Sequence, residues 1–287
     1  MKEDKDSLGT RMKSFEFSST HYLTRKIPVI IRVDGKAFHT FCKRFEKPYD
    51  KTLNGSLNGV MFKLCSQIQG VKIAQRHSDE ISFVVTDYDK VTTDSFFEYN
   101  ISKICSVVAS MATAEFCRQL VLEGEIIYKI VNDADMVRST NEKAFNIFDF
   151  RPLSKEEDWP TFDCRCFNLN EFEIGNYLWW RLLDCKRGSI NMLAQCKFSQ
   201  KELHGKNCDQ MQEMLFQTHG INWAKLPQEQ KAGFLCVRKK VVKPIEAGPN
   251  KGQECERNIW EVQPAPSTKV QLDEILKGIS FRDDTQE

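Results

Sequence analysis

The sequence predicts an α+β protein whose elements follow the order strand, helix, strand, strand, helix, strand. Runs rich in β-branched and aromatic residues recur at 28–34, 70–88 and 161–169. Two segments with apolar residues at helical spacing lie between these runs. The βαββαβ order is the ferredoxin-type split βαβ arrangement, which many unrelated proteins share, so it predicts no function by itself.

The first strand and the first helix have distinct sequence signatures. Residues 28–34 (PVIIRVD) form a nearly continuous β-branched run, which is typical of a strand buried on both faces. Residues 53–68 carry apolar side chains three and four positions apart, which predicts a helix with one buried face. These side chains belong to Leu53, Leu57, Val60, Met61, Leu64 and Ile68.

The next elements complete the expected order. Residues 70–88 predict two strands, because apolar residues flank the polar tetrapeptide His-Ser-Asp-Glu, which suits a hairpin connection. Residues 94–122 predict a long helix with Asp94 or Ser95 as its N-cap. Residues 161–169 (TFDCRCFNL) predict the last strand of the core.

The remainder of the chain is predicted to be helical and then polar. Residues 170–198 and 198–220 each predict a helix, the second beginning at Ser199 and ending at Gly220. Beyond Lys240 the sequence becomes rich in Pro, Gly and charge, which predicts a hairpin or a loose tail. We therefore divide the chain into a core (1–170), a helical C-terminal region (171–240) and a tail (241–287).

Composition excludes several classes of protein. The 287 residues are 41% hydrophobic and 28% charged with a net charge of +1, which fits neither a disordered chain nor a membrane protein. The N-terminus mixes both charge signs, unlike a secretory signal or a transit peptide, so a cytoplasmic location is expected. Eleven cysteines without a signal peptide predict reduced thiols, and Cys164 and Cys166 lack the second pair that a zinc site requires.

Three carboxylates mark the ends of the predicted strands. Asp34 ends the first strand, and Asp79 and Glu80 lie in the hairpin connection. In a split βαβ fold the first and third strands are neighbours, so the topology brings Asp34 beside Asp79. Together with the Gly35 carbonyl they predict a Mg²⁺ site, because Mg²⁺ prefers oxygen ligands. Spacing alone leaves open an alternative, in which Asp34 caps a turn and the hairpin tip is simply solvated.

Three ordered motifs carry a resemblance to a known family. The motifs are RVDGKAFHTF (32–41), FEKPYD (45–50) and HSDEISF (77–83), followed by FDCRCFNL, YLWWRLLDC and GINWAKLP. Over roughly residues 8–235 the chain resembles the tRNA-His guanylyltransferase family. The resemblance implies that residues 1–170 form a palm-like catalytic core, like that of polymerases, which adds nucleotides to the 5′ end of RNA.

The resemblance also implies roles for individual residues. Asp34, Gly35 and Asp79 fall on positions that bind two Mg²⁺ ions, and Glu80 fills the neighbouring acidic, catalytic position. Nucleotide contacts fall on Lys36, Ala37, Phe38, His39 and Ser78, besides the metal-binding residues themselves, and Arg32, Lys47 and Lys103 fall near the triphosphates. The implied substrates are GTP, ATP and tRNA, without a membrane, and the implied assembly is a homotetramer.

One departure from the family pattern concerns the branch. Residues 184–195 read DCKRGSINMLAQ, where Lys186 and Gly188 replace the histidine- and asparagine-rich stretch of enzymes that add one guanylate to tRNA-His. The sequence is more similar to the Thg1-like protein branch, which implies templated repair of truncated tRNA 5′ ends. The alternatives are a strict tRNA-His guanylyltransferase, a palm-type nucleotide cyclase and a non-catalytic RNA-binding module, although the aromatic motif typical of such modules is absent.

Contacts with RNA would have to come from local cations, because the net charge is close to zero. Each candidate cluster alone is more often an ordinary solvated surface, so we consider them only together. The clusters comprise Arg11, Lys13, Arg25, Lys26, Lys186, Arg187, Arg238, Lys239 and Lys240. Trp179 and Trp180 suit either the core or an interface between subunits.

Overall fold

The computed structural model describes residues 7–90, 92–133, 159–246, 251–279 and 281, without the side chains of residues 123–133. The first six residues, part of the charged N-terminus, lie outside this range. One antiparallel sheet organises the described chain, with its strands in the order β4-β1-β3-β2-β5-β6. Its strands are β1 (Val29–Gly35), β2 (Val71–His77), β3 (Glu80–Val85), β4 (Phe162–Asn168), β5 (Phe234–Pro244) and β6 (Glu254–Pro264).

The central four strands confirm the predicted α+β fold. Their order β4-β1-β3-β2 places β1 beside β3, as the split βαβ arrangement requires. Val29, Ile31 and Val33 point to one face of the sheet, and Ile30 points to the other. All four side chains are fully buried, which explains the continuous β-branched run in the sequence.

Helices α3 (Lys51–Gln67) and α4 (Ile101–Asp133) cover the first face. Helix α3 begins after Asp50, whose carboxylate accepts a hydrogen bond from the Leu53 amide at 2.8 Å and so satisfies one unpaired donor of the first turn. Leu57, Val60, Met61 and Leu64 are buried against the sheet. Full burial of such side chains contributes about 1.5–3 kcal/mol each.

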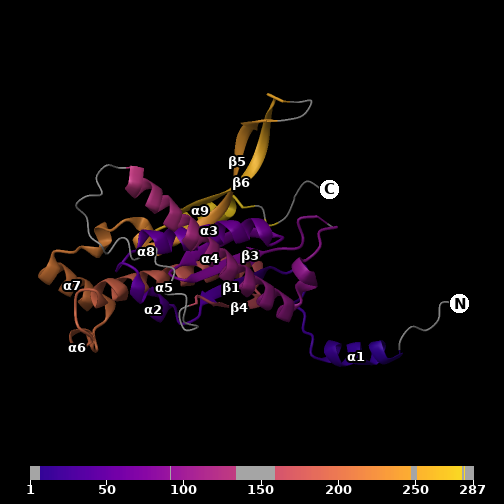
Figure 1. Ribbon diagram of the computed structural model, residues 1–287, viewed down its shortest axis with the longest axis horizontal. Coiled ribbons are helices and arrows are strands. Elements are labelled where there is room, and N and C mark those ends of the chain that lie inside the picture. Colours follow the sequence, from indigo (N-terminus) through magenta and orange to yellow (C-terminus); the bar gives the residue numbers. More distant parts are fainter. Residues whose placement is uncertain (1–6, 91, 134–158, 247–250, 280, 282–287) are drawn as a thin grey trace.

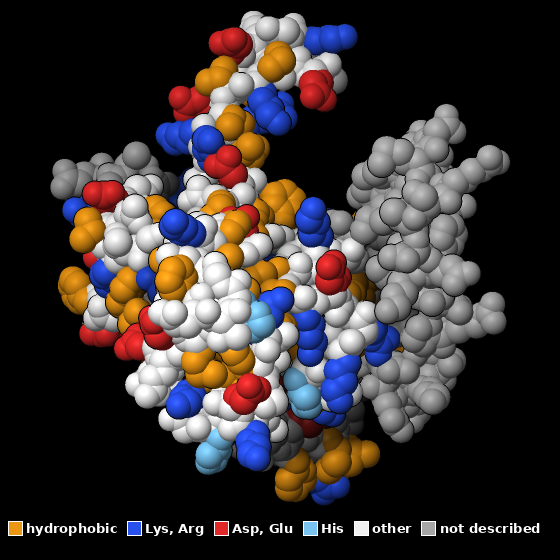
Figure 2. Space-filling view, turned by 90° about the vertical axis from the view of Figure 1, so that its left-hand side faces the viewer, with side chains coloured by type: hydrophobic (Ala, Val, Ile, Leu, Met, Phe, Trp, Pro, Cys, Tyr) orange, Lys and Arg blue, Asp and Glu red, His pale blue; other side chains and the backbone are white. Residues whose placement is uncertain are grey.

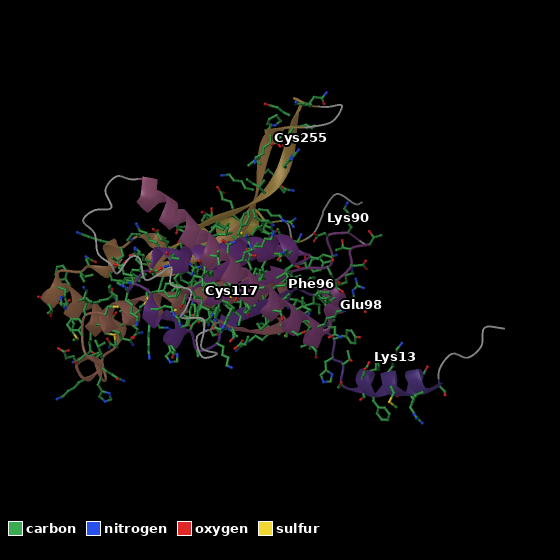
Figure 3. All side chains as sticks on the ribbon, in the orientation of Figure 1. Lys13, Lys90, Phe96, Glu98, Cys117 and Cys255 are labelled. Atoms are coloured by element: carbon green, nitrogen blue, oxygen red, sulfur yellow. The ribbon has the colours of Figure 1, made fainter. Side chains whose placement is uncertain are left out.

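The beginning of α4 differs from the prediction. A 3₁₀ turn, η2 (Phe96–Tyr99), precedes the helix, and Figure 3 labels its residues Phe96 and Glu98. Phe97 and Glu98 have left-handed backbone angles in this turn. These angles are incompatible with a continuous helix, so α4 starts at Ile101, with the Asn100 side chain accepting a hydrogen bond from the Lys103 amide. Asp94 and Ser95 are therefore not its N-cap.

Over Ile101–Leu122, α4 is long and apolar enough to cross a membrane by length and composition alone. Core helices pass the same test. Ile104, Val108, Ala112 and Phe116 recur every four residues and are fully buried in the core beneath the sheet. Thr113 of this helix also accepts a hydrogen bond from the Phe162 amide at the start of β4. The helix therefore packs as a core element.

Helix α5 (Ile174–Gln195) covers the second face after a short turn, η6 (Glu171–Glu173). It buries Ile174, Leu178 and Leu182 against Ile30 and Val84. The segment 198–220 contains two helices instead of the predicted one, α6 (Gln200–Leu203) and α7 (Cys208–His219). Capping boxes at Ser199 and Asn207 start the two helices, and Gly205 takes a left-handed angle between them. Gly220 ends α7, as predicted.

The C-terminal segments join the sheet. After η7 (Trp223–Lys225) and α8 (Gln228–Ala232), β5 crosses residue 240, where the sequence placed the start of the tail. Its first residues pair with β2, and the remainder pairs only with β6 in a hairpin that projects from the body (Figure 1). Helix α9 (Lys269–Lys277), which the sequence did not predict, packs Leu272 against the α5 face.

Three short elements lie at the margins of the sheet. Helix α1 (Ser7–Ser18) has no buried residue and lies apart from the body (Figure 1). Helix α2 (Phe38–Phe41) and the 3₁₀ turn η1 (Cys42–Arg44) follow directly after β1. All eleven cysteines are free thiols.

Candidate active site

The structure brings Asp34, Gly35 and Asp79 together at one end of the sheet. Asp34 lies in the penultimate position of β1, and Asp79 lies in the turn between β2 and β3. A methyl group built on Gly35 would lie 2.7 Å from Asp79 Oδ2, so the carboxylate of Asp79 lies directly against the Gly35 backbone. The two carboxylates are therefore neighbours across the β1–β3 pair, although 45 positions separate them in the sequence.

Both carboxyl groups have pKa values raised above the ordinary range. Burial raises the pKa of Asp34, and the negative charges of Asp79, Glu80 and Asp163 raise it further. Burial likewise raises the pKa of Asp79, more than a hydrogen bond from the Ser78 hydroxyl at 2.7 Å lowers it. Within the described residues, neither Asp34 nor Asp79 has an ion-pair partner. Carboxylates that repel one another in this way favour a bound cation.

This donor set fits a divalent cation such as Mg²⁺. Two carboxylates beside the Gly35 backbone offer the hard oxygen ligands that Mg²⁺ prefers. Across the described ranges, no group of three or more His, Cys, Asp and Glu side chains is arranged to hold a metal ion. The remaining ligands would therefore be water and substrate phosphates, which is usual for Mg²⁺ sites that act on nucleotides.

Glu80 has a different environment from the two aspartates. Its two carboxylate oxygens accept hydrogen bonds from Arg181 of α5, at 2.7 and 2.8 Å, and one lies 3.2 Å from His77 Nε2. Burial raises the pKa of Glu80, but hydrogen bonds and charges from His77 and Arg181 outweigh it and hold the pKa below its usual range. The Glu80 carboxylate thus binds α5 to the start of β3, and its catalytic role stays a prediction.

Sequence reasoning missed the partners of these carboxylates. Arg181 stands in the YLWWRLLDC motif and His77 directly precedes Ser78, but neither was assigned a role. Asp163 of β4 is opposite Asp34 in the strand register, and Arg165 binds Asp163 at 2.8 Å. The β4 register was the missing signal, because the sequence gives the strand but not its alignment with β1.

The segment after Gly35 is anchored beside the site by its buried aromatic side chain and by a hydrogen bond from the Lys36 amide to the Thr161 carbonyl. Ala37 is exposed in a left-handed conformation at the start of α2. Phe38 is buried against Phe41, Phe116 and Phe162, so it anchors the segment and its ring is not available to a nucleotide. The side chains of Lys36 and His39 are exposed. The predicted nucleotide contacts would therefore come from these two side chains and from main-chain groups.

The predicted phosphate-binding cations lie in three different places. Arg32 is mostly buried, its Nη1 is 4.0 Å from Glu80, and its Nε lacks a hydrogen-bond partner in the described structure. Lys47 is exposed before α3, close enough to Cys42 that its charge and the charge of Asp79 both act on the pKa of that thiol. Arg32 therefore lies beside Glu80, whereas Lys47 lies near Cys42, in the segment that follows α2.

Lys103 lies away from this site. It occupies the first turn of α4, with its ammonium group 5.0 Å from the centre of the Phe97 ring. The backbone around the start of α4 forms hydrogen bonds with His21 and Leu23. The next residue, Thr24, donates to the side chain of Asn168 at the end of β4, and Asn168 is opposite Val29, the first residue of β1. Asp34 is at the opposite end of β1. Within one chain, therefore, the fold does not bring Lys103 to the carboxylates.

Most of the basic clusters considered for RNA binding are already engaged. Arg25 and Lys26 bind Asp87, and Arg187 binds Asp184. Lys186 donates to the Ser267 carbonyl, and Arg238 stacks on Trp260. Lys239 pairs with Glu261, and Lys240 pairs with Glu256. Arg11 and Lys13 lie on the separate helix α1. On the side of the molecule that carries α6 and α7, Lys, Arg and His side chains gather on the surface (Figure 2).

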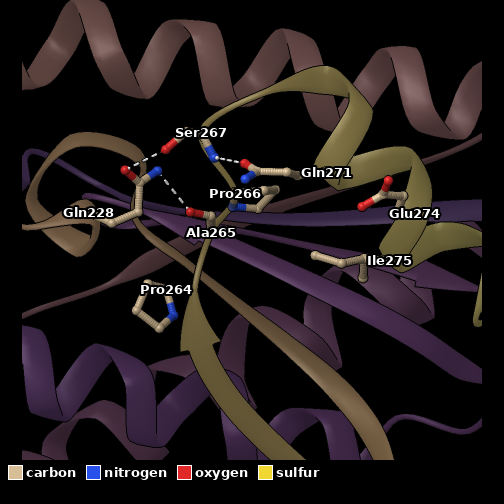
Figure 4. A pocket seen from close by; sticks show the side chains of 8 residues that line it. All are labelled: Gln228, Pro264, Ala265, Pro266, Ser267, Gln271, Glu274 and Ile275. Atoms are coloured by element: carbon tan, nitrogen blue, oxygen red, sulfur yellow. Dashed lines mark hydrogen bonds between the residues drawn. The ribbon is translucent and has the colours of Figure 1, made fainter.

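The two tryptophans differ in burial, and an interface between subunits stays a prediction. Trp179 packs partly buried against the α5 core, whereas Trp180 is half exposed beneath the Arg181 guanidinium. A surface recess lies elsewhere, between α8 and α9 (Figure 4), where Gln228 bonds to Ser267 and to the Ala265 carbonyl. Its lining includes none of the carboxylates described above.

We predict that Gly35→Ala damages the site through this close approach. The new methyl group would lie 2.3 Å from the Phe38 ring and 2.7 Å from Asp79, so one of them must move. We expect the free energy of unfolding to fall by about 1–3 kcal/mol, and nucleotide addition to slow by about 100-fold if Asp79 moves by 1 Å. Urea unfolding and single-turnover kinetics measure both.

Gly188→Ala is the matched control for the loss of stability. It adds the same methyl group to α5 with no atom within 4 Å. Its stability should be unchanged or higher, because alanine favours a helix more than glycine does. Equal behaviour of the two variants would contradict the close packing of Gly35 against Asp79.

Comparison with known proteins places this architecture in a family. Residues 9–170 match the family described as Thg1, tRNAHis guanylyltransferase. A bacterial tRNA(His) guanylyltransferase (Thg1)-like protein in complex with ATP is 31% identical, with a TM-score of 0.72 over 96% of this chain and 100% of that one. The complex of such a bacterial protein with GTP is also 31% identical, with a TM-score of 0.68 over 94% and 96%.

A curated relative gives the same result. The probable tRNA(His) guanylyltransferase of Dictyostelium discoideum is 29% identical over 235 residues, which cover 80% of this chain and 82% of the relative. The resemblance inferred from the sequence motifs is thus confirmed. This chain is a nucleotidyltransferase that belongs to the tRNAHis guanylyltransferase family.

Proposed function

We propose that this protein is a metal-dependent 3′-to-5′ nucleotidyltransferase that rebuilds truncated 5′ ends of tRNA by templated addition. The observation that carries the proposal is the proximity of two carboxylates, Asp34 and Asp79, beside the Gly35 backbone. Within the described residues, neither carboxylate has an ion-pair partner. Two bound Mg²⁺ ions would activate the attacking hydroxyl and hold the leaving phosphate. Asp34 and Asp79 would bind these ions, and the exposed Lys36 and His39 would contact the nucleotide.

Growth toward the 5′ end requires an activated RNA terminus. In the first step the 5′-monophosphate of the RNA attacks the α-phosphorus of ATP, and pyrophosphate leaves. In the second step the 3′-hydroxyl of the incoming nucleotide attacks the activated 5′ phosphorus, and AMP leaves. Arg32, beside Glu80, and the exposed Lys47 would stabilise the charge on the phosphates. The complexes of similar bacterial proteins with ATP and with GTP support both nucleotides as substrates.

Residues 184–195 support templated repair over strict guanylate addition. They lie within α5, where Lys186 donates to the Ser267 carbonyl at 2.7 Å and lies 4.9 Å from the Trp179 ring centre. The side chain of Lys186 therefore packs against other parts of the same protein. The bacterial Thg1-like proteins at 31% identity support the same branch. A homotetrameric assembly and a cytoplasmic location stay predictions, which light scattering and cell fractionation would test.

The test is to change the template base. The protein is given tRNAs of several identities that lack the first nucleotide, each with one of four bases at the opposing position of the acceptor stem. We expect the added nucleotide to follow the opposing base by Watson–Crick pairing, because a mismatch commonly costs about 1–3 kcal/mol, roughly ten- to 100-fold in rate. Sequencing of the 5′ ends measures the outcome.

Further control reactions separate the alternatives. Addition of G regardless of the opposing base, confined to full-length tRNA-His, would show a strict guanylyltransferase. Nucleotide consumed without RNA would show a cyclase, and no consumption under any condition would show a binding module. RNA with a 5′-triphosphate should bypass the requirement for ATP, whereas equal extension of 5′-monophosphate RNA without ATP would contradict the activation step.

A further inference from the structure

Arg76 of β2 is a buried cation that forms no ion pair with a carboxylate in the described chain, although Asp79 lies close enough for its charge to act on the guanidinium. It is 1% exposed and one of the largest fully buried side chains. Arginine is rarely buried unless it is paired, because removing its charge from water is unfavourable. Burial lowers its pKa to about 10, so the guanidinium still carries its charge at neutral pH. A cation kept in such a place requires a structural reason.

The hydrogen bonds of Arg76 supply that reason. Its Nε donates to Asn58 Oδ1 at 2.7 Å and its Nη2 to Asn54 Oδ1 at 3.0 Å, both on α3. Its Nη1 donates to the Ser78 carbonyl at 2.7 Å. Three neutral acceptors thus surround the guanidinium, and two of them are fixed by the helix. The third belongs to the turn that precedes Asp79.

The turn itself needs an external support. Ser78 has a positive φ of 49°, which is unfavourable for a residue with a side chain. The Ser78 carbonyl belongs to the peptide group that joins Ser78 to Asp79. The Ser78 hydroxyl donates a hydrogen bond to the Asp79 carboxylate. A bond to this carbonyl therefore fixes the orientation of the peptide plane, and with it the direction from which the Asp79 carboxylate leaves the backbone.

The C-terminal strand closes the same cluster. Phe234 of β5 is opposite Arg76 in the register, and its ring centre lies 4.8 Å from the guanidinium carbon. A methyl group on Gly233 would lie 2.2 Å from the Arg76 carbonyl oxygen, so only glycine allows this approach. Arg76 thus connects α3 and β5 to the turn of Asp79.

We propose that Arg76 is a positioning residue for nucleotide addition: through the Ser78 carbonyl it holds the Asp79 carboxylate at the separation from Asp34 that the divalent cations require. The inference rests on the proposed function, since it assigns Asp79 to cation binding. Arg76 does not touch the substrate. Lysine cannot replace it, because a single ammonium group cannot reproduce the planar fork that joins two asparagines and a carbonyl.

The test compares Arg76→Lys and Asn54→Ala with Met61→Ala. Met61 is fully buried in the core on α3 and takes no part in the hydrogen bonds of Arg76, so its variant should lose stability while this network stays in place. Two readouts are needed, kcat and KM for 5′-truncated tRNA, and the affinity for Mn²⁺ measured by electron paramagnetic resonance without RNA or nucleotide. Urea unfolding ranks the variants by stability.

We expect Arg76→Lys to lower kcat and Mn²⁺ affinity by about 10- to 100-fold, as removal of a metal site's supporting residue does. KM for tRNA should stay the same, and excess Mn²⁺ should recover part of the activity. Met61→Ala, at equal or lower stability, should keep both values within about twofold of the original protein. Asn54, which is only partly buried, allows its variant to fold, and a smaller loss of both values is expected.

The inference is wrong if, in Arg76→Lys and Asn54→Ala, the losses of kcat and Mn²⁺ affinity stand in the same proportion to the loss of stability as in Met61→Ala. In that case Arg76 has only a structural role. Failure of the proposed function gives a different result. The original protein would then add no nucleotide to tRNA, while its Mn²⁺ affinity would still exceed that of Arg76→Lys.

Discussion

Asp34→Asn and Asp79→Asn should each abolish nucleotide addition while leaving the fold intact. Each change removes one of the two carboxylates that would bind the cation. Among the described residues, the other carboxylates nearby, Glu80 and Asp163, are already paired with arginines. We expect a loss in kcat of the order of 10³-fold, comparable with the removal of a central charge-stabilising group. Extension of 5′-truncated tRNA over a range of Mg²⁺ concentrations measures it.

The same two changes should raise the stability of the metal-free protein at neutral pH. The pKa values of Asp34 and Asp79 are raised in the folded state, so the folded protein binds more protons than the unfolded chain at mildly acidic pH. Stability therefore falls as the pH rises from the ordinary aspartate value of 3.8 through the raised pKa values. An asparagine carries no charge and removes this loss, which urea unfolding with EDTA at pH 5 and pH 8 would show.

Asp163→Asn provides the matched control. This carboxylate faces Asp34 across the β1–β4 pair, but it is half exposed and bound by Arg165. The same substitution should lower activity far less and should not raise stability, because it removes an attractive pair as well as a repulsion. Near-normal addition by Asp79→Asn at low Mg²⁺ would contradict the two-metal assignment.

The sequence was sufficient to predict the elements whose pattern arises from burial. β1 and the β2–β3 hairpin are buried on both faces and α3 is buried on one, so their apolar patterns follow directly from burial. The proximity of Asp34 and Asp79 followed from topology, because adjacent strands fix where their ends meet. These predictions depended on no particular side-chain contact.

Features set by single contacts could not be predicted. The break before α4 depends on the left-handed angles of Phe97 and Glu98, which residues with side chains rarely adopt. The strand β5 begins inside a segment predicted as helical, because pairing with β2 overrides local preference. Asp79 and Glu80 are consecutive in the sequence, but the pKa of Asp79 is raised and the pKa of Glu80 is lowered. This difference depends in part on Arg181, an arginine about 100 positions away that binds Glu80.

The pair of Glu80 and Arg181 should produce the largest change in stability. Both side chains are less than 10% exposed, and the arginine donates to both carboxylate oxygens. Removing Arg181 takes away the two direct hydrogen bonds of a buried carboxylate and leaves it only His77 and the more distant Arg32, so we expect Arg181→Met to lower the free energy of unfolding by about 3 kcal/mol. The double variant with Glu80→Gln should lose less than the sum of the two single losses. Urea unfolding of the four proteins gives the coupling energy.

The pH dependence and the activity of Glu80→Gln decide what Glu80 does. Because the folded pKa of Glu80 is lowered, its stabilising contribution is complete above the ordinary value of 4.5 and is lost as the pH falls through the folded pKa. Glu80→Gln should therefore lose stability at pH 7 and show a flatter decline in acid. If its activity falls only in proportion to stability, Glu80 binds α5 to the sheet. If its activity disappears while stability is unchanged, Glu80 is the catalytic carboxylate that its position beside Asp79 in the sequence predicts.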